Sequence, residues 1–232
     1  MDNSAGLPDY YALIACIHGI TGLVIFFTGL LQFALKKGGR MHRIIGRIYL
    51  YSWISILATG AFIGSPVIVA IVLMGFYLTI TGIRAAIIRN RANTLADKAI
   101  VTIAAIVVLL ILIAAIYALI NRNYPISIIA GFFALLYGIV ISGDIRTYIF
   151  NRKRAKYGRM DWYVNHLTRM QFSFVTAVSA FIAVQNVFGN TVLNFILPSL
   201  IGFVVIRFST NYFVKKLKLK PESNPDPTFQ AS

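Results

Sequence analysis

Two of the three histidines in this 232-residue chain stand beside arginines at the edges of apolar segments. His42 precedes Arg43 in the stretch GGRMHRIIGRIYLY (38–51), and His166 precedes Arg169 by three residues. Histidines on two facing helices could ligate haem b iron from both sides, with nearby arginines pairing with its propionates. The same pair could instead hold a divalent metal, a quinone head group or a proton. Alternatively, both could be interfacial residues with satisfied hydrogen bonds.

The spacing around His42 indicates which side chains would accompany it. If a helix begins near Met41, then His42, Gly46 and Tyr49 share one face, because they are spaced i, i+4 and i+7. A glycine on that face would let a neighbouring helix or a flat ligand approach closely. The candidate cofactor-binding residues are therefore His42, His166, Arg43, Arg169 and Tyr49, with Arg47 as a further partner for propionates and with both histidines as the metal ligands.

Three other polar residues lie within or at the ends of apolar segments. His18 falls inside the run of residues 10–35, where an ionisable group is costly and therefore a candidate site. The alternative is a neutral imidazole that is hydrogen-bonded to a neighbouring helix. Asp144 and Arg84 each close an apolar run on the same side, and we expect them to form a charge pair or to serve in a proton relay.

Composition determines which elements must position these residues. Apolar residues make up 58% of the chain and charged residues only 12%, with a mean hydropathy of +0.76. A soluble domain carries about 25% charged residues, so the sequence predicts an integral membrane protein. Nucleic acid binding is not expected despite the net charge of +15, because the basic residues lie in short blocks between apolar runs.

The apolar runs predict an all-α, polytopic bundle of seven transmembrane helices. Gly64-Ser65-Pro66 divides one long run and Phe188-Gly189-Asn190 another, because proline and glycine interrupt helices. The predicted spans are 10–35, 48–64, 66–84, 99–121, 124–145, 170–188 and 191–209. They form one domain over residues 1–214, followed by a basic and then disordered cytoplasmic tail over 215–232.

The basic residues predict the orientation of this bundle. With seven spans, segments 36–47, 84–98, 144–169 and the segment from residue 207 onward face one side, and they contain all but one of the 22 Lys and Arg residues. Because positive loops are retained in the cytoplasm, we expect the N-terminus outside the cell and the C-terminus in the cytoplasm. The chain is expected to be a multi-pass protein of the cell inner membrane. This basic face would also attract anionic lipids of the surrounding bilayer. Gly-Arg-Met occurs at 39–41 and at 158–160, which is compatible with a 3+1+3 parallel repeat.

Residues 18–49 resemble a known family. His18-Gly19-Ile20-Thr21-Gly22, Gln32-Phe33 and Met41-His42-Arg43-Ile44-Ile45-Gly46-Arg47-Ile48-Tyr49 are similar to domain-of-unknown-function family 2306, a group of bacterial polytopic membrane proteins. The family pattern also has a later His-Arg-x-x-Met-Arg segment, whereas this chain has His166-Leu167-Thr168-Arg169-Met170. The resemblance implies a bacterial inner-membrane protein in which His18, His42 and His166 are matching positions, and it implies no particular activity.

Three functional hypotheses follow from these residues. The leading hypothesis is electron transfer by a haem or quinone bound to His42 and His166 at the cytoplasmic side. A second is a transporter of small molecules or ions with His18 and Asp144 as proton-coupling groups. A third is a lipid-interacting scaffold without catalysis. Sequence motifs of phosphate-binding loops, serine hydrolases and zinc proteases do not occur, so the sequence does not decide whether the chain is an enzyme.

Overall fold

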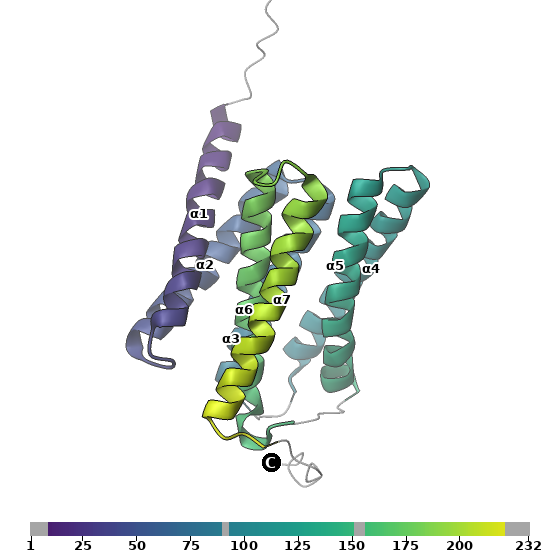
Figure 1. The fold of residues 1–232 in the computed structure, drawn as a ribbon. Helices are drawn as coiled ribbons and strands as arrows, with labels where there is room; N and C mark the ends of the chain where they lie inside the picture. The colour runs from purple at the N-terminus through teal and green to yellow at the C-terminus, as the bar shows by residue number, and fades with distance from the viewer. Residues whose placement is uncertain (1–8, 90–92, 151–155, 221–232) are drawn as a thin grey trace, which may run out of the picture.

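The chain folds into a bundle of seven long helices that lie side by side (Figure 1). The computed structural model describes residues 9–89, 93–150 and 156–220, and these residues form no strand. The long helices are α1 (Asp9–Ala34), α2 (Arg40–Ile63), α3 (Pro66–Ile88), α4 (Leu95–Ile120), α5 (Tyr124–Asp144), α6 (Asp161–Val184) and α7 (Thr191–Lys216). All seven are long and apolar enough to cross a membrane. The predicted all-α bundle with seven membrane-spanning helices is therefore confirmed.

Turn residues end the helices where the sequence predicted breaks. Between α2 and α3, the hydroxyl of Ser65 accepts a hydrogen bond from the backbone N–H of Ile68, and Pro66 opens the new helix. Between α6 and α7, Gly189 adopts a positive φ of 63°, which glycine reaches without steric cost. The side chain of Asn190 then caps α7 by accepting from the backbone N–H groups of Val192 and Leu193.

Several helices extend beyond the charge-free runs used to predict them. Helix α2 begins at Arg40 rather than near residue 48, and α6 begins at Asp161 rather than near 170. Arginine and lysine favour helices, and their long side chains can reach water from a helix end, so an apolar run marks the apolar layer and not the whole helix. At the other end of the chain, Lys215 and Lys216 belong to α7, while residues 221–232 of the predicted tail lie outside the described residues.

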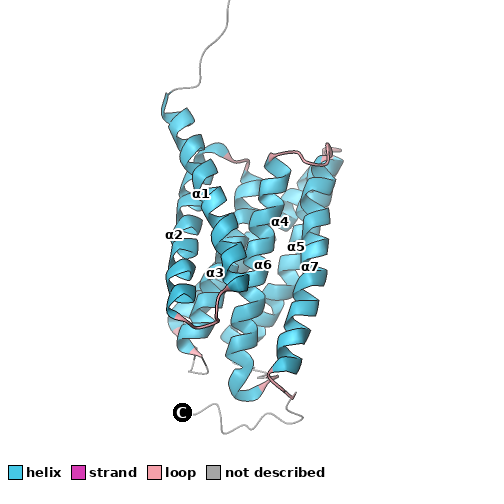
Figure 2. Ribbon diagram, turned by 60° about the vertical axis from the view of Figure 1, so that its left-hand side comes forward, coloured by secondary structure: helices cyan, strands magenta, loops and turns pink. Residues whose placement is uncertain are grey.

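The helices pack around α6. It lies against α1, α3 and α7, while the α4–α5 hairpin packs on α3 and α7 (Figures 1 and 2). The main hydrophobic core lies between α3, α4 and α5, with Phe133 buried at its centre. A smaller core, Ile25, Tyr49, Trp53 and Ile56, joins α1 to α2.

Four helices form a ring in which neighbouring helices pack together and the helices across each diagonal do not. Around this ring α1 packs on α2, α2 on α3, α3 on α6 and α6 on α1. The backbones of α2 and α6, both described throughout, do not approach closely, so only side chains connect these two helices. In a four-helix ring, side chains on facing helices can enclose a ligand.

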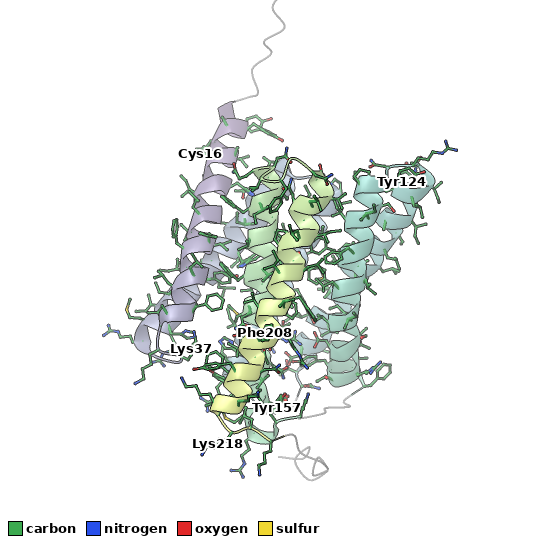
Figure 3. The ribbon with its side chains drawn as sticks, viewed as in Figure 1. Cys16, Lys37, Tyr124, Tyr157, Phe208 and Lys218 are labelled. Carbon is green, nitrogen blue, oxygen red and sulfur yellow. The ribbon has the colours of Figure 1, made fainter. Side chains whose placement is uncertain are left out.

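The ends of the bundle differ in the side chains they carry. Lys37, Tyr157 and Lys218 lie toward one end of the molecule, whereas Cys16 and Tyr124 lie toward the other (Figure 3). The two Gly-Arg-Met segments occupy comparable places, because 39–41 begins α2 and Gly158–Met160 forms a short 3₁₀ turn directly before α6. The internal repeat nevertheless stays a prediction.

Candidate cofactor-binding cavity

His42 and His166 face each other across the gap between α2 and α6. Their ring centroids are 6.2 Å apart, and the ring planes make an angle of 74°. Both rings line an open cavity of about 640 Å³ whose walls come from α1, α2, α3 and α6. The structure thus brings together the two histidines that the sequence singled out.

One hydrogen bond fixes the tautomer of His166. Its Nδ1 lies 2.8 Å from the backbone oxygen of Gly82 on α3. Because a carbonyl oxygen can only accept, Nδ1 carries the proton and donates it, and a neutral ring then keeps the lone pair on Nε2. This arrangement is typical of a histidine whose second nitrogen binds a metal.

Three buried polar atoms on the wall of this cavity have no hydrogen-bond partner among the described residues. They are Nδ1 of His42, Oε1 of Gln32 and Oε1 of Gln171. Leaving a buried polar group unpaired costs about 1–3 kcal/mol, so side-chain rotations that bring these atoms into contact with a ligand in the cavity would be favoured. The two amide nitrogens are already engaged, since Gln32 donates to the backbone oxygen of His42 and Gln171 donates to Ser209 Oγ.

The cavity combines apolar walls with positive charge. Lys37, Arg43, Arg47 and Arg89 line it, and none of its described lining residues is acidic. The ammonium group of Lys37 donates to the backbone oxygen of Gln32, and burial lowers the pKa of this lysine. Much of the remaining wall is apolar, with Phe33, Leu50, Ile83, Ile87, Met170 and Phe174 among its side chains. The cavity therefore suits a ligand with an apolar body and an anionic edge.

Tyr49 and Gly46 lie on the cavity side of α2, as the i, i+4, i+7 spacing predicted. The Tyr49 hydroxyl lies 3.0 Å from Ser173 Oγ, which lies 2.5 Å from Thr79 Oγ1. Because Thr79 donates its hydrogen to the backbone oxygen of Gly75, the bonds run from Tyr49 to Ser173 to Thr79. Tyr49 therefore contributes its ring to the cavity, while its hydroxyl connects α2 to α6 and α3.

Arg169 lies outside this cavity, contrary to its predicted role beside the histidines. Its guanidinium group donates to the carboxylate of Asp144 on α5 and, at 2.8 Å, to Thr81 Oγ1 on α3. Tyr77 donates to the other oxygen of the same carboxylate. Arg169 is therefore occupied by a buried ion pair and does not reach the space between the two imidazoles.

The predicted charge pair between Arg84 and Asp144 is wrong. Arg84 Nε donates to Asp97 Oδ1 at 2.7 Å, and its Nη2 donates to Thr94 Oγ1 at 2.9 Å. Asp97 stands in the first turn of α4, where it forms a capping box with Thr94. Asp97 was not predicted as the partner of Arg84, because the only candidates considered were charged residues that end an apolar run.

A second, more polar cavity of about 380 Å³ lies on the other side of the α3–α6 contact. Both ion pairs line it, together with Tyr148 from the π-helical turn Ile145–Ile149 that follows α5. Arg89 and Trp162 line both cavities, and the Arg89 guanidinium carbon lies 5.2 Å from the centre of the Trp162 ring. This cation–π pair is part of the wall between the two cavities.

His18 belongs to neither cavity. Its Nδ1 lies 2.9 Å from Thr59 Oγ1 on α2, and Thr59 donates its own hydrogen to the backbone oxygen of Ser55. His18 must therefore donate through Nδ1, which matches the interpretation as an imidazole bonded to a neighbouring helix. His18 and Asp144 accordingly have separate partners.

The number of protein ligands restricts the kind of metal site. Among the described residues, no group of three or more His, Cys, Asp or Glu side chains could hold a metal ion. Comparison of the chain with protein-family models, curated proteins and solved structures finds no match. The proposals below therefore rest on the residues and geometry of this chain.

Proposed function

We propose that this chain is an integral membrane protein that binds haem b through His42 and His166 and takes part in electron transfer. The observation that carries the proposal is the spacing of the two imidazoles, whose centroids lie 6.2 Å apart. His42 from α2 and His166 from α6 would hold a haem iron between them if one nitrogen of each imidazole were directed at it.

The set of available ligands favours haem over a bare divalent metal. A structural or catalytic zinc ion takes three or four protein ligands, whereas the porphyrin of haem supplies four of the six iron ligands itself. Two histidines therefore complete a haem site. The hydrogen bond from His166 Nδ1 to Gly82 leaves Nε2 for the iron.

The charges that line the cavity also fit haem. Its two propionates are anionic and its ring is apolar, and the cavity has four cationic lining residues, Lys37, Arg43, Arg47 and Arg89, with no acidic lining residue described. Arg43, which the sequence predicted as a partner of the propionates, lines the cavity and keeps that proposed role. Arg169 does not line the cavity, so Lys37 and Arg89 take its place as proposed partners of the propionates. When bound, haem supplies a one-electron redox centre, and the chain orients it and excludes water.

We also propose that the protein lies in a bacterial inner membrane. The concentration of basic residues in segments 36–47, 84–98, 144–169 and the tail supports an outside N-terminus and an inside C-terminus. The cavity then opens at the cytoplasmic face, where the same cations would contact anionic lipids. The resemblance of residues 18–49 to domain-of-unknown-function family 2306 supports the bacterial source.

An absorption spectrum tests haem binding directly. The protein is expressed with added haem and purified in detergent, together with His42→Ala, His166→Ala and the matched control His18→Ala. We expect a Soret band in the wild type and in the control, and its loss or marked shift in the two cavity variants. A wild-type protein without a Soret band, or a band that survives both cavity substitutions, would refute haem ligation by this pair.

A quinone head group is the second candidate, and the three unpaired polar atoms favour it. A quinone carbonyl accepts hydrogen bonds, a quinol hydroxyl donates them, and His42 Nδ1 with Gln32 and Gln171 Oε1 offers both kinds of partner. Quenching of tryptophan fluorescence by a short-chain quinone measures binding, because Trp162 lines the cavity. Gln171 Oε1 can only accept a hydrogen bond, so Gln171→Leu should weaken binding of the corresponding quinol, measured by the same quenching, about tenfold, and an unchanged quinol affinity would exclude the quinol from this site.

A further inference from the structure

A closed ring of hydrogen bonds joins α3, α5 and α6 beside the histidine cavity. Arg169 donates to Asp144 and to Thr81 Oγ1, and Tyr77 donates to Asp144. The ring closes because Thr81 Oγ1 donates to the backbone oxygen of Tyr77 at 2.8 Å. Each of the four side chains therefore has a partner, and the pair Asp144–Arg169 is buried, with 6% and 13% of the side-chain surface exposed.

The same turn of α3 also holds His166. Thr81, which accepts from Arg169, directly precedes Gly82, whose carbonyl oxygen accepts from His166 Nδ1. His166 and Arg169 are three residues apart on α6, so they lie on adjacent turns and straddle this part of α3. The guanidinium of Arg169 and the imidazole of His166, one turn apart on α6, therefore bind the adjacent residues Thr81 and Gly82 of α3.

Close contact between the helices makes both bonds possible. A Cβ atom at Gly82 would lie 3.0 Å from Met170 Sδ and 3.1 Å from Arg169 Cβ, so even alanine there would displace its neighbours on α6 by a few tenths of an ångström. A slip of α6 by one residue would move His166 by about 1.5 Å along the helix axis. A one-residue slip along the helical screw also turns His166 by about 100° around the axis, which would carry its imidazole away from the Gly82 carbonyl oxygen that it contacts at 2.8 Å.

We propose that Arg169 is a positioning residue, which fixes the register of α6 against α3 and thereby sets the orientation and tautomer of His166. Buried ionic groups are best attested in this role of fixing registry. The hydrogen-bonded ring of Asp144, Arg169, Thr81 and Tyr77 holds α3 in place against α6. The orientation of His166 then depends on the position of α3, because its Nδ1 donates to the Gly82 carbonyl oxygen. The orientation of the imidazole does not depend on any ligand, whereas its effect on haem affinity rests on the proposed function.

Nitrogen NMR of the protein labelled with ¹⁵N-histidine measures the tautomer without haem. The resonances of His166 are assigned by their loss in His166→Gln. In the wild type we expect a protonated Nδ1 and an unprotonated Nε2. In Arg169→Met we expect a mixture of tautomers, and in the control Arg146→Met, which removes an exposed arginine, the wild-type pattern.

Two further variants separate positioning from a general loss of folding. Arg169→Met leaves the Asp144 carboxylate buried and unpaired, whereas the double variant Asp144→Asn with Arg169→Gln removes both charges and keeps amide hydrogen bonds. We expect the double variant to recover the wild-type tautomer. Thr81→Val leaves the ion pair intact and removes only the acceptor on α3, so it should give the mixed tautomers of Arg169→Met.

Haem titration then tests the consequence for the cavity. Removal of a group that orients a metal-bound histidine lowers affinity about 10–100-fold, and we expect this loss in Arg169→Met and Thr81→Val. A wild-type tautomer in either variant would overturn the positioning role. Mixed tautomers in a protein that binds no haem at all would support the positioning role and refute only the proposed function.

Discussion

Replacing Tyr49 by phenylalanine should weaken the connection between α2 and α6 without creating a cavity. The Tyr49 hydroxyl donates to Ser173, which donates to Thr79, and all three residues are buried. The backbones of α2 and α6 stay apart, so this hydrogen bond and the apolar packing of α6 side chains on the Tyr49–Trp53 cluster connect the two helices. The substitution Tyr49→Phe removes one hydrogen bond and keeps the ring that packs on Trp53.

The structure determines the expected magnitudes. Hydrogen bonds between membrane helices contribute about 0.6 kcal/mol on average and at most about 1.7, so Tyr49→Phe should lower the free energy of unfolding by about that average. Ser173→Ala removes two bonds and leaves the Tyr49 hydroxyl, on a residue that is 2% exposed, without an acceptor. The expected loss for Ser173→Ala is therefore about 1–3 kcal/mol.

Unfolding in mixed micelles of lipid and increasing SDS, followed by circular dichroism, measures these free energies. The double variant should lose less than the sum of the single losses, because both substitutions remove the same bond. Tyr51→Phe is the matched control, since this tyrosine lies two residues away on α2 and is 65% exposed. Equal losses for Tyr49→Phe and Tyr51→Phe, or fully additive losses in the double variant, would refute the bridge.

Three further predictions concern other parts of the bundle and use the same unfolding measurement. Gly29→Ala places a Cβ 2.3 Å from the Phe174 ring and should cost about 1–3 kcal/mol, whereas Gly19→Ala, with nothing within 4 Å, should show no such loss. Asp97→Ala removes the carboxylate that caps α4 and pairs with an arginine of α3, and we expect a loss of about 1–3 kcal/mol. Because burial lowers the pKa of Lys37, the folded chain releases this proton first, so the free energy of unfolding should rise with pH between the lowered pKa and 10.5. Lys37→Gln should abolish that rise, and a rise that persists would contradict the assignment.

The helices could be predicted from the sequence because a membrane span is a local property. Gly64-Ser65-Pro66 and the Asn190 cap mark helix ends that chain chemistry alone dictates. The charge-free runs that predict the spans begin later than α2 and α6, because basic residues can continue a helix beyond the apolar layer, whereas the helix start expected near Met41 agrees with the start of α2 at Arg40. Apolar runs therefore predict the positions of the membrane spans, but α2 and α6 themselves begin about two turns earlier, in sequence that contains basic residues.

The site was predictable only where helical spacing and charge patterns sufficed. His42, Gly46 and Tyr49 follow from one helix face, and His42 meets His166 as expected. The partner of Arg169 depends on how α3, α5 and α6 pack, which no single helix encodes. Gln171 was not among the predicted site residues and Gln32 was noted only through the family resemblance, although amide side chains within apolar runs are a recognisable signal of a polar interior.

The ring of helices around the cavity has a consequence for biosynthesis. Residues 29–50 and 83–89 supply three walls early in the chain, but the fourth wall begins at Trp162. Membrane helices insert first and associate afterwards, so during translation the first three helices remain an open half-site while the α4–α5 hairpin is made. A ligand held by both His42 and His166 could therefore be bound only after α6 (Asp161–Val184) has entered the membrane, in the last third of synthesis.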